Sequence, residues 1–560
     1  MSGGPLGIRL DRDAIGQRAA LLVAAGFLLV SLALPLATLF GKSFRDRDGQ
    51  FVGLANFVRY FGTPSLVASL WSTVWVSLLA TCIVVPLAFV YAYAIRRTTM
   101  PGRGVFRALG LVPILAPSLL PAIALIYLFG NQGFARFMLM GESIYGPIGI
   151  VIAQVYYCFP HAFLILSTAL AIADRRHYEA AEVLGAGRVR VFLTVTLPGV
   201  KYGIVSAFFV VFTMIATDFG IPKVIGGRFN VLATDVYKQV IGQQNFEMGA
   251  VVGMVLLLPA MIAFAADRWV ARRQVALLSA RAVPFEPQKR KLRDLVLFAF
   301  CALVATCILV VLGVAAWASL IQYWPYNLSL SLRNYAFQNA DASGWSSYFN
   351  TLAMAACAAT IGCSVVAFGA WLVDKTRGAE FLRGVVHLLA MIPLAVPGLV
   401  LGLSYIFFFN APGNPLGFIY GTLAILVLNT IAHFYTVAHL TSLQALKQLD
   451  PEFESVSSSL KISVWRTAWQ VTLPVSSQAL LDVWFYMFVN AMTTVSAVIF
   501  LYGPYTKLAS VAIVNMDEAG FTAAAAAMGC TIVATSAAAK VLHSLLAAWL
   551  DRRTQAWRAR

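Results

Sequence analysis

Twelve long apolar stretches constrain this chain more than any other feature of its sequence. A helix needs about 20 apolar residues to cross the hydrocarbon core of a bilayer, and the 560 residues are 60% hydrophobic but only 12% charged. So little charge cannot cover the surface of a soluble protein of this length. The sequence therefore predicts an all-α membrane protein with about 12 transmembrane helices, near residues 19–40, 69–95, 105–129, 147–173, 199–219, 247–270, 295–320, 348–373, 385–409, 422–445, 477–500 and 522–549.

Prolines interrupt several of these stretches. A proline inside a helix removes one backbone donor, and in a membrane the freed groups must find partners on neighbouring helices. Each proline therefore predicts either a kink or a complete break, and the sequence leaves both open. The positions are Pro86, Pro113, Pro117, Pro121, Pro393 and Pro397.

Basic residues indicate how the helices are oriented. Most of the 41 Lys and Arg residues lie in segments that share a side of the membrane with the N-terminus. Because basic loops stay in the cytoplasm, we expect both termini there. Membrane topology then accounts for the net charge of +17, and no nucleic-acid partner is expected.

The two halves of the chain repeat one motif. The letters VTLP end at Pro198 and again at Pro474, and Asp174 and Asp450 lie at the same spacing of 276 residues. A parallel repeat of two six-helix units predicts a substrate pathway at the interface of the halves. The expected parts are a first half, a basic cytoplasmic linker and a second half, at residues 1–273, 274–294 and 295–560.

The loop at 174–198 lies between two apolar stretches and is too polar for lipid. Asp174 can cap a short helix, Gly185 suits the end of that helix, and Pro198 suits the first turn of the next span. Two interpretations are open at this point. The helix is either a knob for a groove on a soluble partner or a connector that rests on lipid headgroups; its second copy favours the partner.

This loop resembles the EAA signature of the permeases of ATP-binding-cassette (ABC) importers. The matching letters are EAA, a glycine four residues later and LP at the end of the loop. The resemblance implies the type I, MetI-like permease fold with two tandem six-helix repeats, in which this loop docks into a cytoplasmic ATPase. The residues that it assigns to ATPase coupling are Glu179, Ala180, Ala181, Gly185, Leu197 and Pro198.

The second copy, at 450–474, departs from that signature. Ser455, Val456 and Ser457 replace Glu-Ala-Ala, Lys461 replaces the glycine, and Glu454 lies one position early. A second docking helix is still expected, with contacts that differ from those of the first. The coupling residues expected here are Glu454, Ser455, Leu460, Lys461 and Pro474.

A wider resemblance suggests the cargo and the partners. A single chain with two permease halves is typical of the ferric-iron permease group, and segments such as TDFGIPKVIGGRFNVLATDVYKQVIG and AVPGLVLGLSYIFFFNAP resemble 2-aminoethylphosphonate permeases. The resemblance implies import of 2-aminoethylphosphonate across a bacterial inner membrane, with ferric iron as the alternative cargo. It also implies two copies of an ATPase that binds ATP and Mg, and a periplasmic substrate-binding protein. A proton-driven secondary transporter is the rival from another class; it predicts carboxylates deep in the spans, where they are scarce.

Polar residues inside the spans are candidates for the translocation path, since polar groups in a membrane are costly unless they have a function. The alternative is that these side chains bond their own helix or a neighbouring one. No catalytic or metal-binding motif is found, and the chain is expected to hold no cofactor of its own. The path candidates are Thr213, Thr217, Asn429, His433, Asn490, Thr493 and Thr494.

Overall fold

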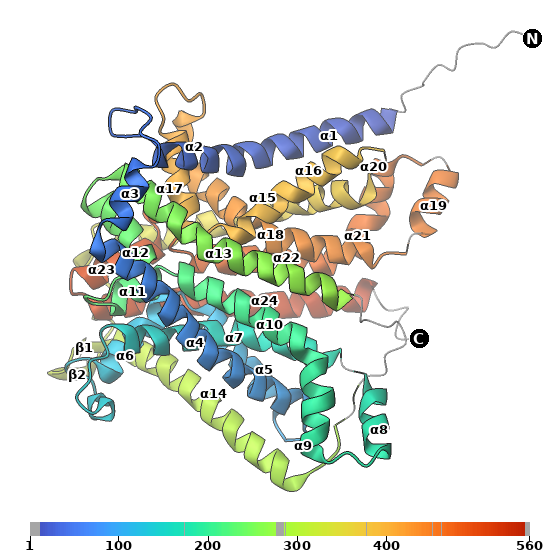
Figure 1. The fold of residues 1–560 in the computed structure, drawn as a ribbon, viewed down its shortest axis with the longest axis horizontal. Coiled ribbons are helices and arrows are strands. Elements are labelled where there is room, and N and C mark those ends of the chain that lie inside the picture. The colour runs from blue at the N-terminus through green and yellow to red at the C-terminus, as the bar shows by residue number, and fades with distance from the viewer. Residues whose placement is uncertain are drawn as a thin grey trace, which may run out of the picture. The chain divides into compact units, whose positions relative to one another are not determined.

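The computed structural model describes residues 12–172, 174–275, 285, 287–376, 378–450, 452–460 and 462–554. In this part of the chain the fold is almost entirely helical, as the composition predicts (Figure 1). Nine of the described helices are long and apolar enough to cross a membrane, and two bent pairs raise the number to eleven if each pair is one span. One small antiparallel ribbon, β1 (Ile321–Tyr323) with β2 (Asn327–Leu330), follows the sixth of these helices.

Short helices lie between many of the long ones along the chain. In order, the nine are the run from α1 to α2 (Asp13–Ser43), α4 (Pro64–Arg97), α7 (Pro147–Ala171), the run from α9 to α10 (Arg188–Thr217), the apolar part of α13 (Phe246–Trp269), α14 (Lys291–Leu320), α15 (Ser346–Lys375), α18 (Leu423–Lys447) and most of α24 (Thr522–Leu550). The short helices include α3 (Ala55–Phe61), α8 (Arg175–Val183), α11 (Gly220–Ile225), α12 (Leu232–Tyr237), α19 (Glu452–Ser459) and α23 (Ala509–Glu518).

Two spans are broken rather than kinked. α5 (Arg103–Leu111) with η2 (Val112–Leu115) meets α6 (Leu119–Phe129) at 101°, and α16 (Glu380–Met391) with η8 (Ile392–Ala395) meets α17 (Gly398–Phe409) at 115°. The residues at the two breaks, Ala116 and Val396, have extended backbones. A following proline ring favours this conformation by steric clash without imposing it. Of the two outcomes that the sequence left open, a complete break therefore occurs at Pro117 and Pro397, whereas Pro86 lies inside the continuous α4.

The expected span at 477–500 is shorter in the structure. α22 (Ser477–Thr493) has only 17 residues and ends where Thr494 adopts an extended backbone. Just before α22, Ser476 donates its hydroxyl to the carbonyl of Thr472 at 2.6 Å, a bond that competes with the helical pattern. The prediction of 12 spans is therefore not confirmed, because the described residues give at most 11 by length and composition.

The chain forms two compact units, each built from segments that are distant in sequence. Unit 1 holds the described residues of Met1–Leu39, Phe349–Thr506 and Thr535–Arg560, and unit 2 holds those of Phe40–Tyr348 and Lys507–Ala534. In unit 2, α4 packs against α7 and α10, and α10 packs against α13. A side-chain carbon on Gly203 of α10 would lie 2.3 Å from that of Ala169 on α7, so these two helices approach as closely as glycine allows.

The first helix of each half packs on the bent pair of the other half. Inside unit 2, α14 lies against α5 and α6. Inside unit 1, α1 lies along α16 (Figure 1), and the buried hydroxyl of Tyr405 on α17 donates to the backbone carbonyl of Ser31 at 2.6 Å. Each unit therefore combines the bent pair of one half with the leading helix of the other.

We expect Tyr405→Phe to destabilise unit 1 without changing its packing. The substitution leaves the Ser31 carbonyl without this donor, and hydrogen bonds between membrane helices contribute about 0.6 to 1.7 kcal/mol. Unfolding of the purified chain in detergent, followed by tryptophan fluorescence, measures the loss. Tyr326→Phe is the control, since that residue is 78% exposed. Equal stability of both variants would show that the bond from Tyr405 to Ser31 does not stabilise the protein.

Candidate functional site

The predicted helix in the 174–198 loop is present and has the expected ends. The side chain of Asp174 accepts a hydrogen bond from the amide of Arg176 at 3.0 Å and so caps α8. Gly185 follows the helix with a φ of 72°, and the amide of Ala186 bonds the carbonyl of Ala181 at 3.0 Å. A glycine with positive φ, followed by a residue whose amide bonds the carbonyl five residues back, is the Schellman motif that ends many helices.

The end of α8 presents an apolar surface to solvent. Val183 and Leu184 are 87% and 84% exposed, and Val189 nearby is 73% exposed. The predicted coupling residues Glu179 and Ala180 are exposed as well. Apolar side chains that protrude together from a charged loop are typical of a docking surface.

The second arm of the loop continues into a membrane-spanning helix. α9 (Arg188–Val191) leads through the π-helical turn η4 (Phe192–Thr196) into α10 (Leu197–Thr217). The predicted Leu197 and Pro198 are the first two residues of α10. The hydroxyl of Tyr178 on α8 donates to that of Thr196 at 3.2 Å, which fastens the short helix to the long one.

The second loop repeats this construction. The side chain of Asp450 accepts from the amide of Glu452 at 2.9 Å and caps α19, as Asp174 caps α8. α20 (Val464–Thr467), the π-helical turn η10 (Ala468–Thr472) and α21 (Leu473–Val475), which contains Pro474, then follow. Leu460 at the end of α19 is 66% exposed and Ser455 lies on the exposed side of α19. The helix expected from the degenerate motif is thus present, while Lys461 lies outside the described residues.

The two short helices are held by different contacts. On α8, the ring of Tyr178 lies 5.1 Å from the guanidinium of Arg97 at the end of α4. On α19, the carboxylate of Glu454 lies 2.5 Å from the ammonium of Lys375 at the end of α15. Tyr178 and Glu454 occupy the same position in the repeat, 276 residues apart. In both halves a cation at the end of a spanning helix therefore contacts the short helix. The contact is with an aromatic ring in the first half and is an ion pair in the second.

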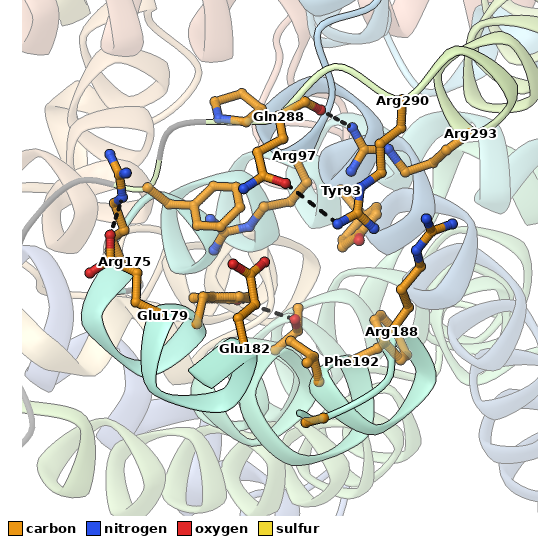
Figure 2. Close-up of a pocket in the computed structure, with 16 residues that line it drawn as sticks. Tyr93, Arg97, Arg175, Glu179, Glu182, Arg188, Phe192, Gln288, Arg290 and Arg293 are labelled. Atoms are coloured by element: carbon orange, nitrogen blue, oxygen red, sulfur yellow. Dashed lines mark hydrogen bonds and ion pairs between the residues drawn. The ribbon is translucent and has the colours of Figure 1, made fainter. Parts of the chain in front are cut away.

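A basic pocket of about 450 Å³ lies behind α8 (Figure 2). The end of α4, the helices of the loop and the segment around residues 285–293 form its walls. From the sequence, only Glu179 among these residues was predicted to have a coupling role. The linker charges were interpreted either as topology signals or as contacts for anionic lipid headgroups. The lining residues are Tyr93, Arg97, Arg175, Tyr178, Glu179, Glu182, Ala186, Arg188, Val191, Phe192, Thr196, Phe285, Pro287, Gln288, Arg290 and Arg293.

The hydroxyls proposed for the path bond their own helices in the structure. Thr213 donates to Phe209, Thr217 to Thr213 and Thr493 to Val489, at 2.8 to 3.0 Å. This is the alternative that the sequence left open, although a hydroxyl keeps acceptor capacity after donating one bond. Their role in the path stays a prediction.

The other path candidates are two asparagines, one histidine and Thr494, and their contacts differ from those of the three hydroxyls. Asn490 donates to the carbonyl of Tyr486 on its own helix at 2.8 Å. Asn429, which is fully buried, donates to the carbonyl of Ala497 at 2.7 Å, so it supports the backbone where the chain has left α22. A carbon added to Gly398 would lie 3.0 Å from Nε2 of His433, which places this imidazole at the break in the second bent pair. Thr494 is the extended residue that ends α22.

We expect Glu454→Gln to loosen α19 and to leave α8 unchanged. The ion pair with Lys375 is partly exposed, and such a pair contributes about 0.5 to 1 kcal/mol. Hydrogen exchange of the α19 amides should therefore accelerate by roughly two- to fivefold, as measured by mass spectrometry of peptides covering both loops. Glu452→Gln, on the same helix but outside this ion pair, is the control. Salt at about 1 M should accelerate the same exchange in the unmodified chain, since the Debye length at that concentration is only about 3 Å. Exchange rates of α19 that change neither with the substitution nor with salt would contradict this role of the ion pair.

Comparison with known proteins identifies the family. The model of the family described as binding-protein-dependent transport system inner membrane component matches residues 84–275 and 376–555, one match in each half. The ferric transport system permease protein FbpB of Actinobacillus pleuropneumoniae is 28% identical over 543 residues, which are 93% of this chain and 77% of that protein. An FbpB protein of Haemophilus influenzae is 30% identical over 445 residues, 76% of this chain and 69% of that protein.

A third relative matches about half of this chain's length. PhnU of Salmonella typhimurium, whose name assigns it to 2-aminoethylphosphonate transport, is 22% identical over 276 residues, 47% of this chain and 96% of its own length. The two family matches include both loops described above. The chain therefore belongs to the binding-protein-dependent transport system inner membrane components and is a multi-pass inner-membrane permease of an ABC importer.

Proposed function

We propose that α8 and α19 are the surfaces on which two copies of a cytoplasmic ATPase drive this permease. The observation that carries the proposal is the continuity between the first loop and a spanning helix, because the chain is helical without a break from Arg188 to Thr217. The bond from Tyr178 to Thr196 joins α8 to this helix. A displacement of α8 by a docked partner is thereby transmitted into the membrane.

The second loop transmits less rigidly on this proposal. The helix that begins at α20 is interrupted at Ser476, between α21 and α22. A movement of α19 is therefore absorbed in part at this interruption. This difference in construction supports the expectation that the second docking helix makes contacts that differ from those of the first.

The transport cycle on this proposal is alternating access. ATP and Mg bind to the partner ATPases, whose closure moves the docking helices and exposes the path to one side of the membrane and then to the other. A periplasmic substrate-binding protein delivers the cargo, and both termini of the permease lie in the cytoplasm. The distribution of Lys and Arg supports this orientation.

We propose 2-aminoethylphosphonate as the cargo, with ferric iron as the second candidate. The long segments that resemble 2-aminoethylphosphonate permeases support the first. The second is supported by the two FbpB relatives, which match more of this chain, and at higher identity, than PhnU does. The permease fold is common to both cargoes, so the choice rests on the substrate-binding protein that works with this chain.

We expect Leu184→Asp to reduce uptake by roughly tenfold or more, because it places a carboxylate in a docking surface whose central residues contribute about 2 kcal/mol each. The side chain is 84% exposed, so the variant should fold and reach the membrane in normal amounts. Leu184→Met, which keeps the apolar surface, is the matched control. Leu460→Asp makes the same change in the second loop and should reduce uptake less. Normal uptake by Leu184→Asp would refute docking at α8.

The cargo can be identified by which loaded receptor stimulates ATP hydrolysis by the complete transporter. The complete transporter in liposomes should hydrolyse ATP faster with the receptor loaded with 2-aminoethylphosphonate than with the empty receptor. Faster hydrolysis with the iron-loaded receptor alone would replace the first cargo by the second. Uptake driven by a proton gradient without ATP would instead favour the secondary transporter.

A further inference from the structure

The basic pocket behind α8 combines charged groups from three separate parts of unit 2. Arg97 comes from the end of α4, Glu182 and Arg188 from the loop, and Arg290 and Arg293 from the segment that precedes or begins α14. Figure 2 shows the carboxylate of Glu182 directed into the pocket, and the guanidinium of Arg188 on the same side as those of Arg290 and Arg293. The pocket therefore lies between α8 and the described residues that lead into α14.

Positive charge in the pocket exceeds negative charge. Five guanidinium groups and two carboxylates line it. Arg175 pairs with Glu179 at 2.7 Å, and Arg293 pairs with Asp294, just outside the pocket, at 2.8 Å. Three guanidinium groups then remain against the single carboxylate of Glu182, a net charge of +2. A phosphate group with a free second ionisation carries about −1.5 to −2 at neutral pH and would neutralise this excess.

Arg97 is already positioned for such an anion. Its side chain is only 3% exposed, and its guanidinium carbon lies 4.1 Å from the ring centre of Phe285. One terminal nitrogen donates to the carbonyl of Leu170 at 3.0 Å, but Nε has no hydrogen-bond partner among the described residues. A buried donor without a partner destabilises the fold, and more so when it is charged; a bound anion would remove that cost.

The other two guanidinium groups retain free donors. Arg290 donates to the neutral side chain of Gln288 at 3.5 Å, which leaves its charge unneutralised. Arg188 is exposed, and no ion pair is formed by it within the described part of the chain. Guanidinium groups bind phosphate through paired parallel hydrogen bonds, which suits recognition of a tetrahedral anion from several sides.

We propose that this pocket binds a phosphate-class dianion between Arg97, Arg188 and Arg290. Such an anion joins the segment around residue 290 to α9 and to the end of α4. Since Phe285 of the same segment stacks on Tyr178 of α8 at 4.7 Å between ring centres, occupancy stiffens the support of the first docking helix. The anion is either a soluble phosphate ester or inorganic phosphate, or the phosphate of a lipid headgroup.

The test measures binding of inorganic phosphate to the purified full chain in detergent, without ATPase or receptor, so its outcome is independent of the proposed coupling function. At constant ionic strength, phosphate should raise the unfolding temperature saturably, sulfate should compete, and chloride should have no effect. Arg188→Gln combined with Arg290→Gln should weaken phosphate binding by roughly tenfold or more, because charged hydrogen bonds to the anion are lost from two sides. Arg190→Gln, on the same short helix but outside the pocket, should bind phosphate as the unmodified chain does.

Two further measurements make the result decisive. Without phosphate, the variants should unfold at the same temperature as the unmodified chain. If the double variant is unstable, Arg188→Gln alone, at an exposed position, replaces it in the binding measurement. An equal phosphate response in these variants, or an equal response to chloride, would overturn the site. In nanodiscs, weaker phosphate binding when phosphatidic acid replaces part of the phosphatidylcholine would assign the site to a lipid headgroup. Unchanged binding would assign it to a soluble phosphate.

Discussion

A peptide group inside a bilayer must find its hydrogen-bond partner within the protein, and the architecture of this permease follows from that constraint. Where the chain stays helical, the helix itself supplies the partners. Where it leaves the helix, side chains from other segments supply them. Thr73 accepts from the amide of Leu232 at 2.8 Å, and Asn429 donates to the carbonyl of Ala497 at 2.7 Å. The polar residues of the spans thus serve the backbone first, which is why polarity alone is weak evidence for a translocation path.

The two cytoplasmic loops show how one construction tolerates different chemistry. Both have an aspartate cap, a short helix, a π-helical turn and a proline near the start of the next helix. What differs is the contact that holds the short helix, a guanidinium on an aromatic ring for α8 and an ion pair for α19. An ion pair near the surface weakens with salt, whereas a contact with a ring depends on it less. The two proposed docking surfaces therefore need not respond equally to the same conditions.

The pocket and the proposed docking surface lie next to each other on α8, and Glu179 belongs to both. Val183 and Leu184 are exposed, while Tyr178, Glu179 and Glu182 line the pocket. A partner on the exposed apolar residues and an anion in the pocket would therefore act on the same short helix. If the anion binds as proposed, residues 287–293 support α8 in addition to leading into α14.

The sequence by itself determined the class, most of the spans and both loop helices with their caps. These features are local: apolar length decides a span, and Asp174, Asp450 and Gly185 act on backbone groups within a few residues. Only the tertiary structure decided that the leading helices pack on the bent pair of the other half, that the spans break at Pro117 and Pro397, and that Arg97 is buried against Phe285. Those outcomes depend on groups far apart in the chain, such as Tyr405 and Ser31, which are 374 residues apart. No local pattern encodes such a pair, because its free energy exists only once the helices are packed.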